Sequence, residues 1–450
     1  MPSEATQELR TIRRLATPVV TTQLGMMMLG VVDMLMLGHF STEALSSAAL
    51  ARVWIMGTFI VVQGLLLGLD PFFSQAHGRR DTHALGLALQ RGALLALLLS
   101  LPLSICWMWT GGFLSLTGAE ADLVLQGGAY GMARVAGVPA FLLFVVLRGW
   151  LQGRGMMQPA MWCILGANLV NIVANWALVF GHLGFPALGV RGAGLATSLT
   201  QWGSLLTLAT IVWVYRLDRG GWTGFCREAL GGLGPILKQG LPIGMHLGIE
   251  VWAFQIATLM ATPFGTEAIA SHAIVLNLAS ISFMVPLGIS IAVSARVGHL
   301  IGEGRRARAQ TSAQVAMAMG VVVMIFFAGV LFFLRERLPV LYNANPRVLA
   351  LTATLLPIAA AFQLFDGLQV VAAGVLRGMG RTAILPILHF VSFYGLGLPV
   401  AWWLAFRRGM GVEGVWWGLG LGLAVVSAAL LIWLLRRGPG SHHFADHTPL

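Results

Sequence analysis

The sequence predicts an all-α polytopic membrane protein with twelve transmembrane helices in two six-helix bundles related by an internal parallel repeat. Three observations lead to this fold class: an apolar composition, twelve apolar runs long enough to cross a bilayer, and a repeat between the halves of the chain. Apolar residues occupy 57% of the 450 positions and charged residues only 10%, against about 25% charged residues in an average soluble domain. This composition excludes an ordinary water-soluble domain.

The twelve apolar runs each reach about the 20 residues that a helix needs to cross the hydrocarbon core. They lie at 15–37, 46–69, 85–109, 124–147, 157–180, 193–214, 237–262, 268–293, 312–334, 350–375, 383–405 and 413–435. The first run follows a polar segment, residues 1–14, that lacks the layout of a cleaved signal peptide. After the last run comes a polar segment with Pro, Gly and His, residues 436–450, which is typical of a disordered tail.

The two halves repeat with an offset near 224 residues, so that each copy holds six spans. Pro18 of the first span corresponds to Pro242 of the seventh, and FSTEAL at 40–45 corresponds to FGTEAI at 264–269. Because six is an even number, both copies insert in the same orientation, and such parallel repeats place a substrate site between them. We therefore expect an N-terminal lobe at 15–214, an inter-lobe linker at 215–236 and a C-terminal lobe at 237–435.

The basic residues predict the orientation in the membrane. The two ends of the chain and alternate connections hold twenty of them: Arg10, Arg13, Arg14, Arg79, Arg80, Arg91, Arg148, Arg154, Arg216, Arg219, Arg227, Lys238, Arg296, Arg305, Arg306, Arg308, Arg377, Arg381, Arg436 and Arg437. The opposite connections hold six: Arg191, Arg335, Arg337, Arg347, Arg407 and Arg408. By the positive-inside rule we expect both termini to be cytoplasmic. The net charge of +11 thus reports topology, and we expect no nucleic-acid partner.

The polar residues give no indication of a cofactor or of an enzyme. Cys106, Cys163 and Cys226 stand far apart, without the paired spacing typical of a metal site or a disulfide framework. The histidines of the spans, among them His246 and His389, are scattered, and no HExxH motif occurs. An intramembrane enzyme with a carboxylate pair is therefore the weakest of the alternatives.

Three carboxylates lie inside apolar runs that are expected to be embedded in the bilayer: Asp33, Glu250 and Asp366. A charge inside the bilayer costs about 3 kcal/mol or more, so that such a residue usually faces a cavity and has a function. The repeat sets these acids apart, because Asp33 aligns with Ala257 and Glu250 aligns with Met26. Acids that the scaffold does not share need an explanation other than architecture.

Glu250 and Asp366 are expected at similar depth. Glu250 lies twelve residues after Lys238, and Asp366 lies eleven residues before Arg377, which is roughly 16–18 Å from the same edge at 1.5 Å per residue. If their helices are neighbours, the two carboxylates share one cavity, where one proton or one Na⁺ between them is favourable. The alternative is that each acid is neutral and hydrogen-bonded in the core.

Asp33 lies about 28 Å along the helix from Arg14 and hence nearer the outer surface. An acid that extends to the interface is therefore an alternative to a functional one. Asn171 and Asn175 in the fifth span are possible polar partners of Asp33 in the same half of the chain. They are four residues apart and therefore share one helix face. Arg52 and Arg134 are cations within spans two and four, for which extension to the outer surface is the favoured interpretation.

Several segments together resemble the multidrug and toxic compound extrusion (MATE) family, NorM type. They are GVVDMLMLGHFSTEALSSAAL at 30–50, SQAHG at 74–78, NIVANWALVFG at 171–181, GIEVWAFQIATLMA at 248–261 and FQLFDGLQVVAAGVLRGMG at 362–380. The resemblance implies two six-helix bundles around a central cleft. It also implies export of cationic or amphipathic organic compounds, driven by entry of Na⁺ or H⁺, with no enzyme activity and no resident cofactor.

The resemblance also implies roles for individual residues. Glu250 and Asp366 match the cation site of the C-terminal lobe, with Na⁺ as one candidate ion, and Asp33 with its partners Asn171 and Asn175 matches the acid site of the N-terminal lobe. Phe362, Gln363 and Met26 are candidates for the substrate cleft. Members of this type often carry a tyrosine one turn before the tenth-helix acid, where this chain has Phe362, which lacks the hydroxyl that could ligate Na⁺.

The expected partners are small organic cations or drugs, Na⁺ or H⁺, and the lipid bilayer, and we expect a monomer. One alternative function is a flippase for lipid-linked oligosaccharide precursors. Such a protein carries an anionic pyrophosphate and should line its cleft with cations, a role for which Arg52 and Arg134 are available. The buried acids argue against it.

Overall fold

The computed structural model describes residues 3–222, 224 and 227–441, and throughout these ranges the regular structure is helical. Eleven helices are long and apolar enough to cross a membrane, and a bent pair raises the number to twelve. The expected all-α membrane fold is therefore confirmed. Cys226 and residues 442–450 of the expected tail lie outside the described residues.

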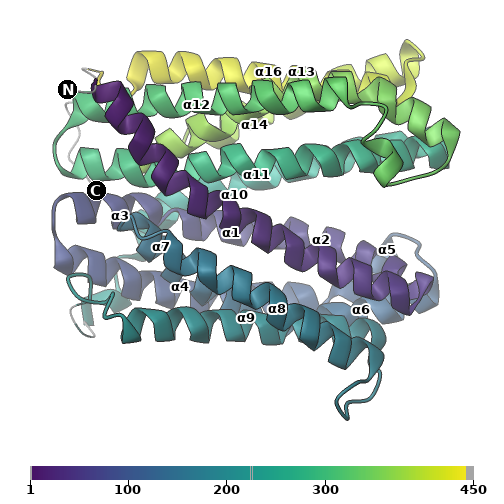
Figure 1. The fold of residues 1–450 in the computed structure, drawn as a ribbon, viewed down its shortest axis with the longest axis horizontal. Coiled ribbons are helices and arrows are strands. Elements are labelled where there is room, and N and C mark those ends of the chain that lie inside the picture. Colours follow the sequence, from purple (N-terminus) through teal and green to yellow (C-terminus); the bar gives the residue numbers. More distant parts are fainter. Residues whose placement is uncertain (1–2, 223, 225–226, 442–450) are drawn as a thin grey trace. The chain divides into compact units, whose positions relative to one another are not determined.

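The first half of the chain contains nine α-helices, which Figure 1 traces in chain order. They are α1 (Glu4–Phe40), α2 (Thr42–Leu67), α3 (Asp70–Gly78), α4 (Thr82–Met108), α5 (Thr110–Leu116), α6 (Ala121–Val135), α7 (Val138–Gly153), α8 (Gln158–Phe180) and α9 (Gly189–Val214). The expected fourth span is the bent pair: α6 and α7 meet at 51°, and Pro139 stands in the first turn of α7, where its missing N–H leaves no helical bond unmade.

The second half begins with α10 (Leu233–Ala261), α11 (Thr266–Gly302), α12 (Arg306–Phe333) and α13 (Pro346–Met379). The eleventh span is irregular: α14 (Leu385–Phe390) and α15 (Leu398–Trp402) alternate with π-helical turns at Val391–Gly397 and Trp403–Arg407. The last span is α16 (Gly411–Arg437). Short connections are possible because side chains cap several helices: Ser41 accepts from the Ala44 N–H at 3.0 Å, and Asp81 accepts from the Ala84 N–H at 2.9 Å.

Packing divides the chain into two compact units. One unit holds residues 21–244, and the other holds residues 1–20 together with 245–450. Each has its own apolar core: Phe144 and Trp150 are among the largest buried side chains of the first, and Phe393 and Trp416 of the second. The first residues of α1 therefore belong with the second half of the chain. The expected lobe boundaries, 15–214 and 237–435, stay a prediction.

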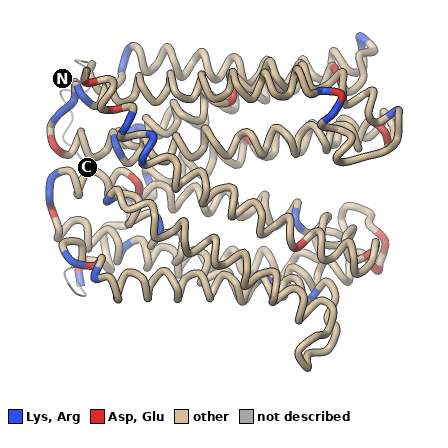
Figure 2. The backbone as a smooth tube through the Cα atoms, viewed as in Figure 1, with Lys and Arg blue, Asp and Glu red and all other residues tan. Residues whose placement is uncertain are grey.

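Charged residues are concentrated at the ends of the helices, as Figure 2 shows. The middle of most helices shows neither blue nor red in this view, which is the distribution of charge expected of segments that face hydrocarbon. The few charges along the helices are consequently the residues that require an explanation.

Candidate functional site

Glu250 of α10 and Asp366 of α13 are joined by Gln369, which lies one turn after Asp366 on the same helix. The Gln369 amide nitrogen donates to Glu250 Oε1 at 2.9 Å and lies 3.3 Å from Asp366 Oδ1. The Asp366 residue is 7% exposed and the Glu250 side chain is 13% exposed. Two carboxylates thus lie in one largely dehydrated site and share a single neutral donor.

Two histidines complete this cluster. His389 of α14 is fully buried, with Nε2 at 3.2 Å from Gln369 Oε1 and 3.9 Å from Glu250 Oε2. Its Nδ1 lies 2.8 Å from the carbonyl oxygen of Leu385, and the ring of His246 lies 4.8 Å from its ring. We name Glu250, Asp366, Gln369, His246 and His389 the acid–histidine cluster.

The hydrogen bonds of this cluster require a proton. Because Nδ1 of His389 faces a carbonyl oxygen, it must donate. If the amide nitrogen of Gln369 faces the carboxylates, its oxygen faces Nε2 of His389, and this contact becomes a hydrogen bond when the ring takes up a second proton. If the amide is turned over, its oxygen faces Glu250, which must then carry the proton. In either orientation, the cluster can make all these hydrogen bonds only if it contains at least one proton more than it would with ionised Glu250 and Asp366 and a neutral His389.

Sequence reasoning did not find the neutral members of the cluster. Gln369 could have been found from its spacing, since it is three residues after Asp366 and therefore on the same helix face. His389 gave a weaker signal, a single polar residue within an apolar run. The sequence places it 139 residues from Glu250, so that only the packing of α14 shows the contact.

Asp33 of α1 forms the second acid site, in the first-half unit. Its Oδ1 accepts hydrogen bonds from Asn171 at 3.2 Å and from Asn175 at 2.8 Å, and its Oδ2 accepts one from the Thr197 hydroxyl at 2.6 Å. Asp33 is 2% exposed, so the alternative of an acid that extends to the interface is wrong. The donor Thr197 on α9 was not found from the sequence.

None of the ion pairs within the described part of the chain joins an arginine or lysine to these three acids. In the described ranges, Glu250 lies 3.9 Å from Nε2 of His389, a contact that is ionic only when the ring is protonated. A buried carboxylate without a fixed cation is costly to ionise, so a mobile cation that binds there gains free energy. The described residues also contain no group of three or more His, Cys, Asp or Glu side chains that could hold a metal ion.

The three residues expected at a substrate cleft have the following positions. Phe362 is 3% exposed and stacks on Trp416 with ring centroids 5.4 Å apart. Gln363 is 1% exposed and exchanges hydrogen bonds with Ser282 at 2.6 and 3.0 Å. Met26 is half-buried, and its sulfur accepts a hydrogen bond from Arg148 at 2.8 Å. Their assignment to a substrate cleft stays a prediction.

The two arginines within spans have partners inside the first-half unit. Arg134 is 8% exposed, lies 5.4 Å above the Trp107 ring and donates to the Tyr130 hydroxyl at 3.2 Å. The expected extension of Arg134 to the outer surface is therefore wrong. Arg52 is half-buried and donates to the Gly30 carbonyl oxygen at 2.9 Å.

Comparison with known proteins identifies this arrangement. The MatE family model matches residues 18–177 and again residues 242–403, so that the two matches begin 224 residues apart, as the internal repeat predicts. A probable multidrug resistance protein NorM of Mesorhizobium japonicum is 36% identical over 96% of this chain and 94% of its own length. The multidrug resistance protein PmpM of Pseudomonas aeruginosa is 33% identical over 95% of this chain and 91% of its own.

Comparison with solved structures indicates the same family. The eukaryotic MATE transporter AtDTX14 superimposes with a TM-score of 0.91 at 25% identity, covering 97% of this chain and 98% of its own. An outward-facing MATE transporter superimposes with a TM-score of 0.84 at 20% identity, covering 96% of this chain and 97% of its own. This chain is therefore a multi-pass membrane protein with bacterial relatives, and it belongs to the MATE family, whose members are transporters and not enzymes.

Proposed function

We propose that this protein is a proton-driven antiporter that exports cationic or amphipathic organic compounds across the bacterial cytoplasmic membrane by alternating access. The single observation that carries the proposal is the acid–histidine cluster, in which two carboxylates meet without an arginine or lysine among their described partners. The names of the relatives, multidrug resistance proteins, support drugs as the compounds that are exported.

The coupling follows from competition for negative charge. An organic cation gains free energy near ionised Glu250 and Asp366, and a proton that binds the cluster removes that attraction. A coupling ion can shift a conformational equilibrium only by the difference in its affinity for the two states. Hydration of the two carboxylates that differs between the states supplies such a difference, because burial disfavours their charged forms.

The chemistry of the cluster favours H⁺ over Na⁺. Hard cations prefer several oxygen ligands, whereas one side of Glu250 is occupied by the imidazole nitrogen of His389 at 3.9 Å. Phe362, one turn before Asp366, offers no hydroxyl. A proton, in contrast, completes the hydrogen bonds of Gln369 and His389.

We assign Asp33 a supporting role as a second site for the coupling proton. Its carboxylate accepts three side-chain hydrogen bonds from neutral donors, which hold it in a fixed position between α1, α8 and α9. The flippase alternative has less support, because Arg134 lies on aromatic rings and Arg52 binds a backbone oxygen. These contacts use the cations that a pyrophosphate would need.

The test is transport of ethidium by the purified protein in proteoliposomes, with proton and sodium gradients imposed separately. We expect the proton gradient alone to drive uptake. Glu250→Gln and Asp366→Asn should each reduce it by about 100-fold or more, because each removes a carboxylate that the proposed coupling requires; this loss corresponds to about 2.7 kcal/mol. Glu267→Gln is the matched control, because Glu267 is a half-exposed acid whose arginine partner, Arg347, is 3.8 Å away.

Three results would contradict the proposal. Uptake driven by sodium and not by protons would refute the choice of ion. Wild-type rates for both cluster variants would refute the site. Flipping of a fluorescent lipid-linked oligosaccharide in the same vesicles, without ethidium uptake, would establish the flippase in its place.

A further inference from the structure

Helix α1 is shared between the two compact units. It is 37 residues long, about 55 Å at 1.5 Å per residue. Its residues up to Val20 group with the second half of the chain, and those from Thr21 onward group with the first half. Each part of this one helix therefore needs a docking face of its own.

The first docking face is a single stripe of α1 at spacing four: Glu8, Ile12, Ala16 and Val20. Ile12 and Ala16 are 0% and 4% exposed and join the core that α11, α12, α13 and α16 form. At Val20 the approach is closest, since a Cβ on Gly288 of α11 would lie 2.9 Å from the Val20 backbone nitrogen. The apolar part of this face thus consists of small or medium side chains against a helix backbone.

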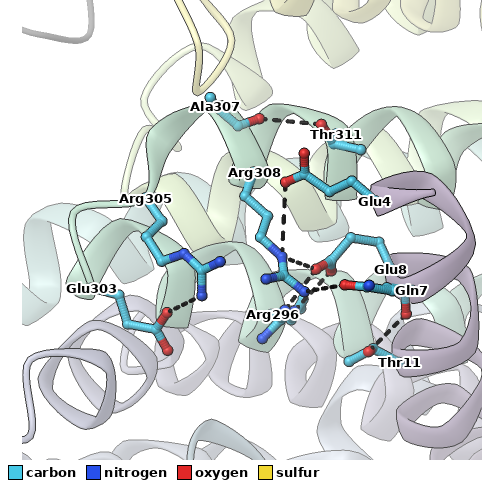
Figure 3. Close-up of polar contacts among 10 residues, drawn as sticks. All are labelled: Glu4, Gln7, Glu8, Thr11, Arg296, Glu303, Arg305, Ala307, Arg308 and Thr311. Carbon is cyan, nitrogen blue, oxygen red and sulfur yellow. Dashed lines mark hydrogen bonds and ion pairs between the residues drawn. The ribbon is translucent and has the colours of Figure 1, made fainter. Parts of the chain in front are cut away.

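The polar part of this face is an ion lock, shown in Figure 3, in which Glu8 lies between two arginines. Arg296 of α11 donates from Nε to Glu8 Oε2 at 2.9 Å and from Nη2 to Oε1 at 2.7 Å, and Arg308 of α12 donates from Nε to Oε1 at 2.6 Å. Glu8 is 0% exposed. A buried, bidentate pair fixes both the depth and the rotation of a helix, because its bonds are directional.

The second docking face lies further along α1. Gly25 lets Ile164 of α8 approach to 2.6 Å from the position that a Cβ would occupy, and its carbonyl oxygen accepts from Asn168 at 3.0 Å. Asp33 is held by Asn171, Asn175 and Thr197, as described above, and Leu37 is 0% exposed within the first-half core. Helix α1 therefore carries one buried carboxylate on each docking face, and each carboxylate is bonded to a different unit.

We propose that Glu8 is a positioning residue for transport that acts through Asp33. By holding the first turns of α1 on the second-half unit, the ion lock makes a change at Asp33 act on both units through one continuous helix. Without the lock, this part of α1 is held less firmly, by the apolar contacts of Ile12, Ala16 and Val20 and by the longer contacts of Arg308 with Glu4 at 3.9 Å and with Gln7 at 3.4 Å. A change at Asp33 is then absorbed within α1. The inference rests on the proposed proton-driven transport.

The test combines transport with hydrogen exchange in a double-mutant cycle. Glu8→Gln should lower proton-driven ethidium uptake by about fivefold or more, the lower end of usual coupling between sites. Thr197→Val, which removes one donor to Asp33, should also lower it. The double variant should be at most about twofold slower than the slower single variant, because both act on the same link. Glu8→Gln should also speed backbone hydrogen exchange in residues 21–40 and not only in residues 4–20.

The matched control is Glu267→Gln. Glu267 pairs with Arg347 at 3.8 Å in the first turn of α11, whereas Arg296 lies near the last turn of that helix, so that uptake and exchange should be unchanged. If Glu8→Gln fails to insert, Arg308→Gln, which leaves the bidentate Arg296 pair in place, should give a smaller effect in the same direction. The inference would be overturned if the loss of uptake in the double variant equalled the product of the two single losses. It would also be overturned if Glu8→Gln sped backbone hydrogen exchange in residues 4–20 alone. Absence of proton-driven uptake in the wild-type protein would refute the proposed function instead, while the exchange result still decides the role of Glu8.

Discussion

At the scale of single residues, the neutral Gln369 governs how the two acids of the second half interact. Its amide nitrogen lies within 3.3 Å of both Glu250 and Asp366, and its amide oxygen faces His389. Two carboxylates this close repel each other unless a donor or a proton lies between them. Gln369 thus links the charge of the acids to the protonation of the histidine.

The substitution Gln369→Leu keeps a similar volume and removes both polar atoms. We expect about a tenfold or larger loss of proton-driven uptake, since a buried group that loses its hydrogen-bond partner costs about 1–3 kcal/mol. The dependence of uptake on external pH should shift as well, because the link to His389 is gone. Initial rates in proteoliposomes across a range of pH measure both effects.

Gln363→Leu is the control for this prediction. Gln363 is also a buried glutamine of α13, but its hydrogen bonds join it to Ser282 of α11. If it lines the substrate cleft, its substitution should change the KM for individual drugs and leave the pH dependence as it is. Equal pH profiles for the wild-type protein and Gln369→Leu would show that Gln369 does not couple the acids to His389.

The sequence predicted the charged residues of the sites and not their neutral partners, for a physical reason. A carboxylate inside an apolar run is costly enough to stand out by itself. Burying a glutamine or threonine in a membrane helix costs little free energy, because its side chain can form a hydrogen bond with the helix backbone. Gln369 and Thr197 therefore become recognisable only when packing brings them to an acid.

At the scale of helices, α13 carries part of the acid–histidine cluster and lies close against α11. Gly374 and Gly378 of α13, four residues apart, face the backbone of Ser290 and Ser294 on α11, and a Cβ on Gly378 would lie 2.5 Å from the Ser294 carbonyl oxygen. Small residues at this spacing let two membrane helices approach closely. The close packing on α11 of the helix that carries Asp366 and Gln369 thus depends on two glycines.

Gly378→Ala should force α13 away from α11. We expect a destabilisation of about 1–3 kcal/mol, the usual cost of one extra carbon in a full core, seen as a lower midpoint of thermal unfolding in detergent. The matched control is Gly166→Ala in α8, where a Cβ meets no atom within 4 Å and a small gain of about 0.5–1 kcal/mol is expected from helix propensity. An unchanged midpoint for Gly378→Ala would mean that the two helices can separate without cost.

The apolar runs predicted where the helices lie but not where they break. Hydropathy reports the length of a span, which residue composition alone determines, whereas a bend depends on how the span packs. The 51° bend between α6 and α7 could have been suspected from Pro139. The π-helical turns at Val391–Gly397 and Trp403–Arg407 have no such marker, since their residues are as apolar as those of a regular span.

At the scale of the whole molecule, the internal repeat accounts for the fold, and the acids that break the repeat are those of the proposed coupling sites. The family model matches both halves. Each half supplies most of one compact unit, but the first residues of α1 group with the second half, and the residues of α10 up to Gly244 group with the first half. The acids are not repeated: Asp33 belongs to one unit, and Glu250 and Asp366 belong to the other. The division of α1 between the units could not be predicted, because a repeat describes similarity between segments and not their contacts.

The distribution of basic residues makes the last prediction, that both termini and the basic connections face the cytoplasm. Twenty of the 28 Arg and Lys residues belong to that side, and this bias sets orientation during insertion. In a variant without the native cysteines, His83→Cys, exposed at the start of α4, should react with a membrane-impermeant thiol reagent only in permeabilised cells. Ala344→Cys, exposed before α13, should react in intact cells. The reverse labelling pattern would show that the termini and the basic connections face outward, and it would contradict this prediction.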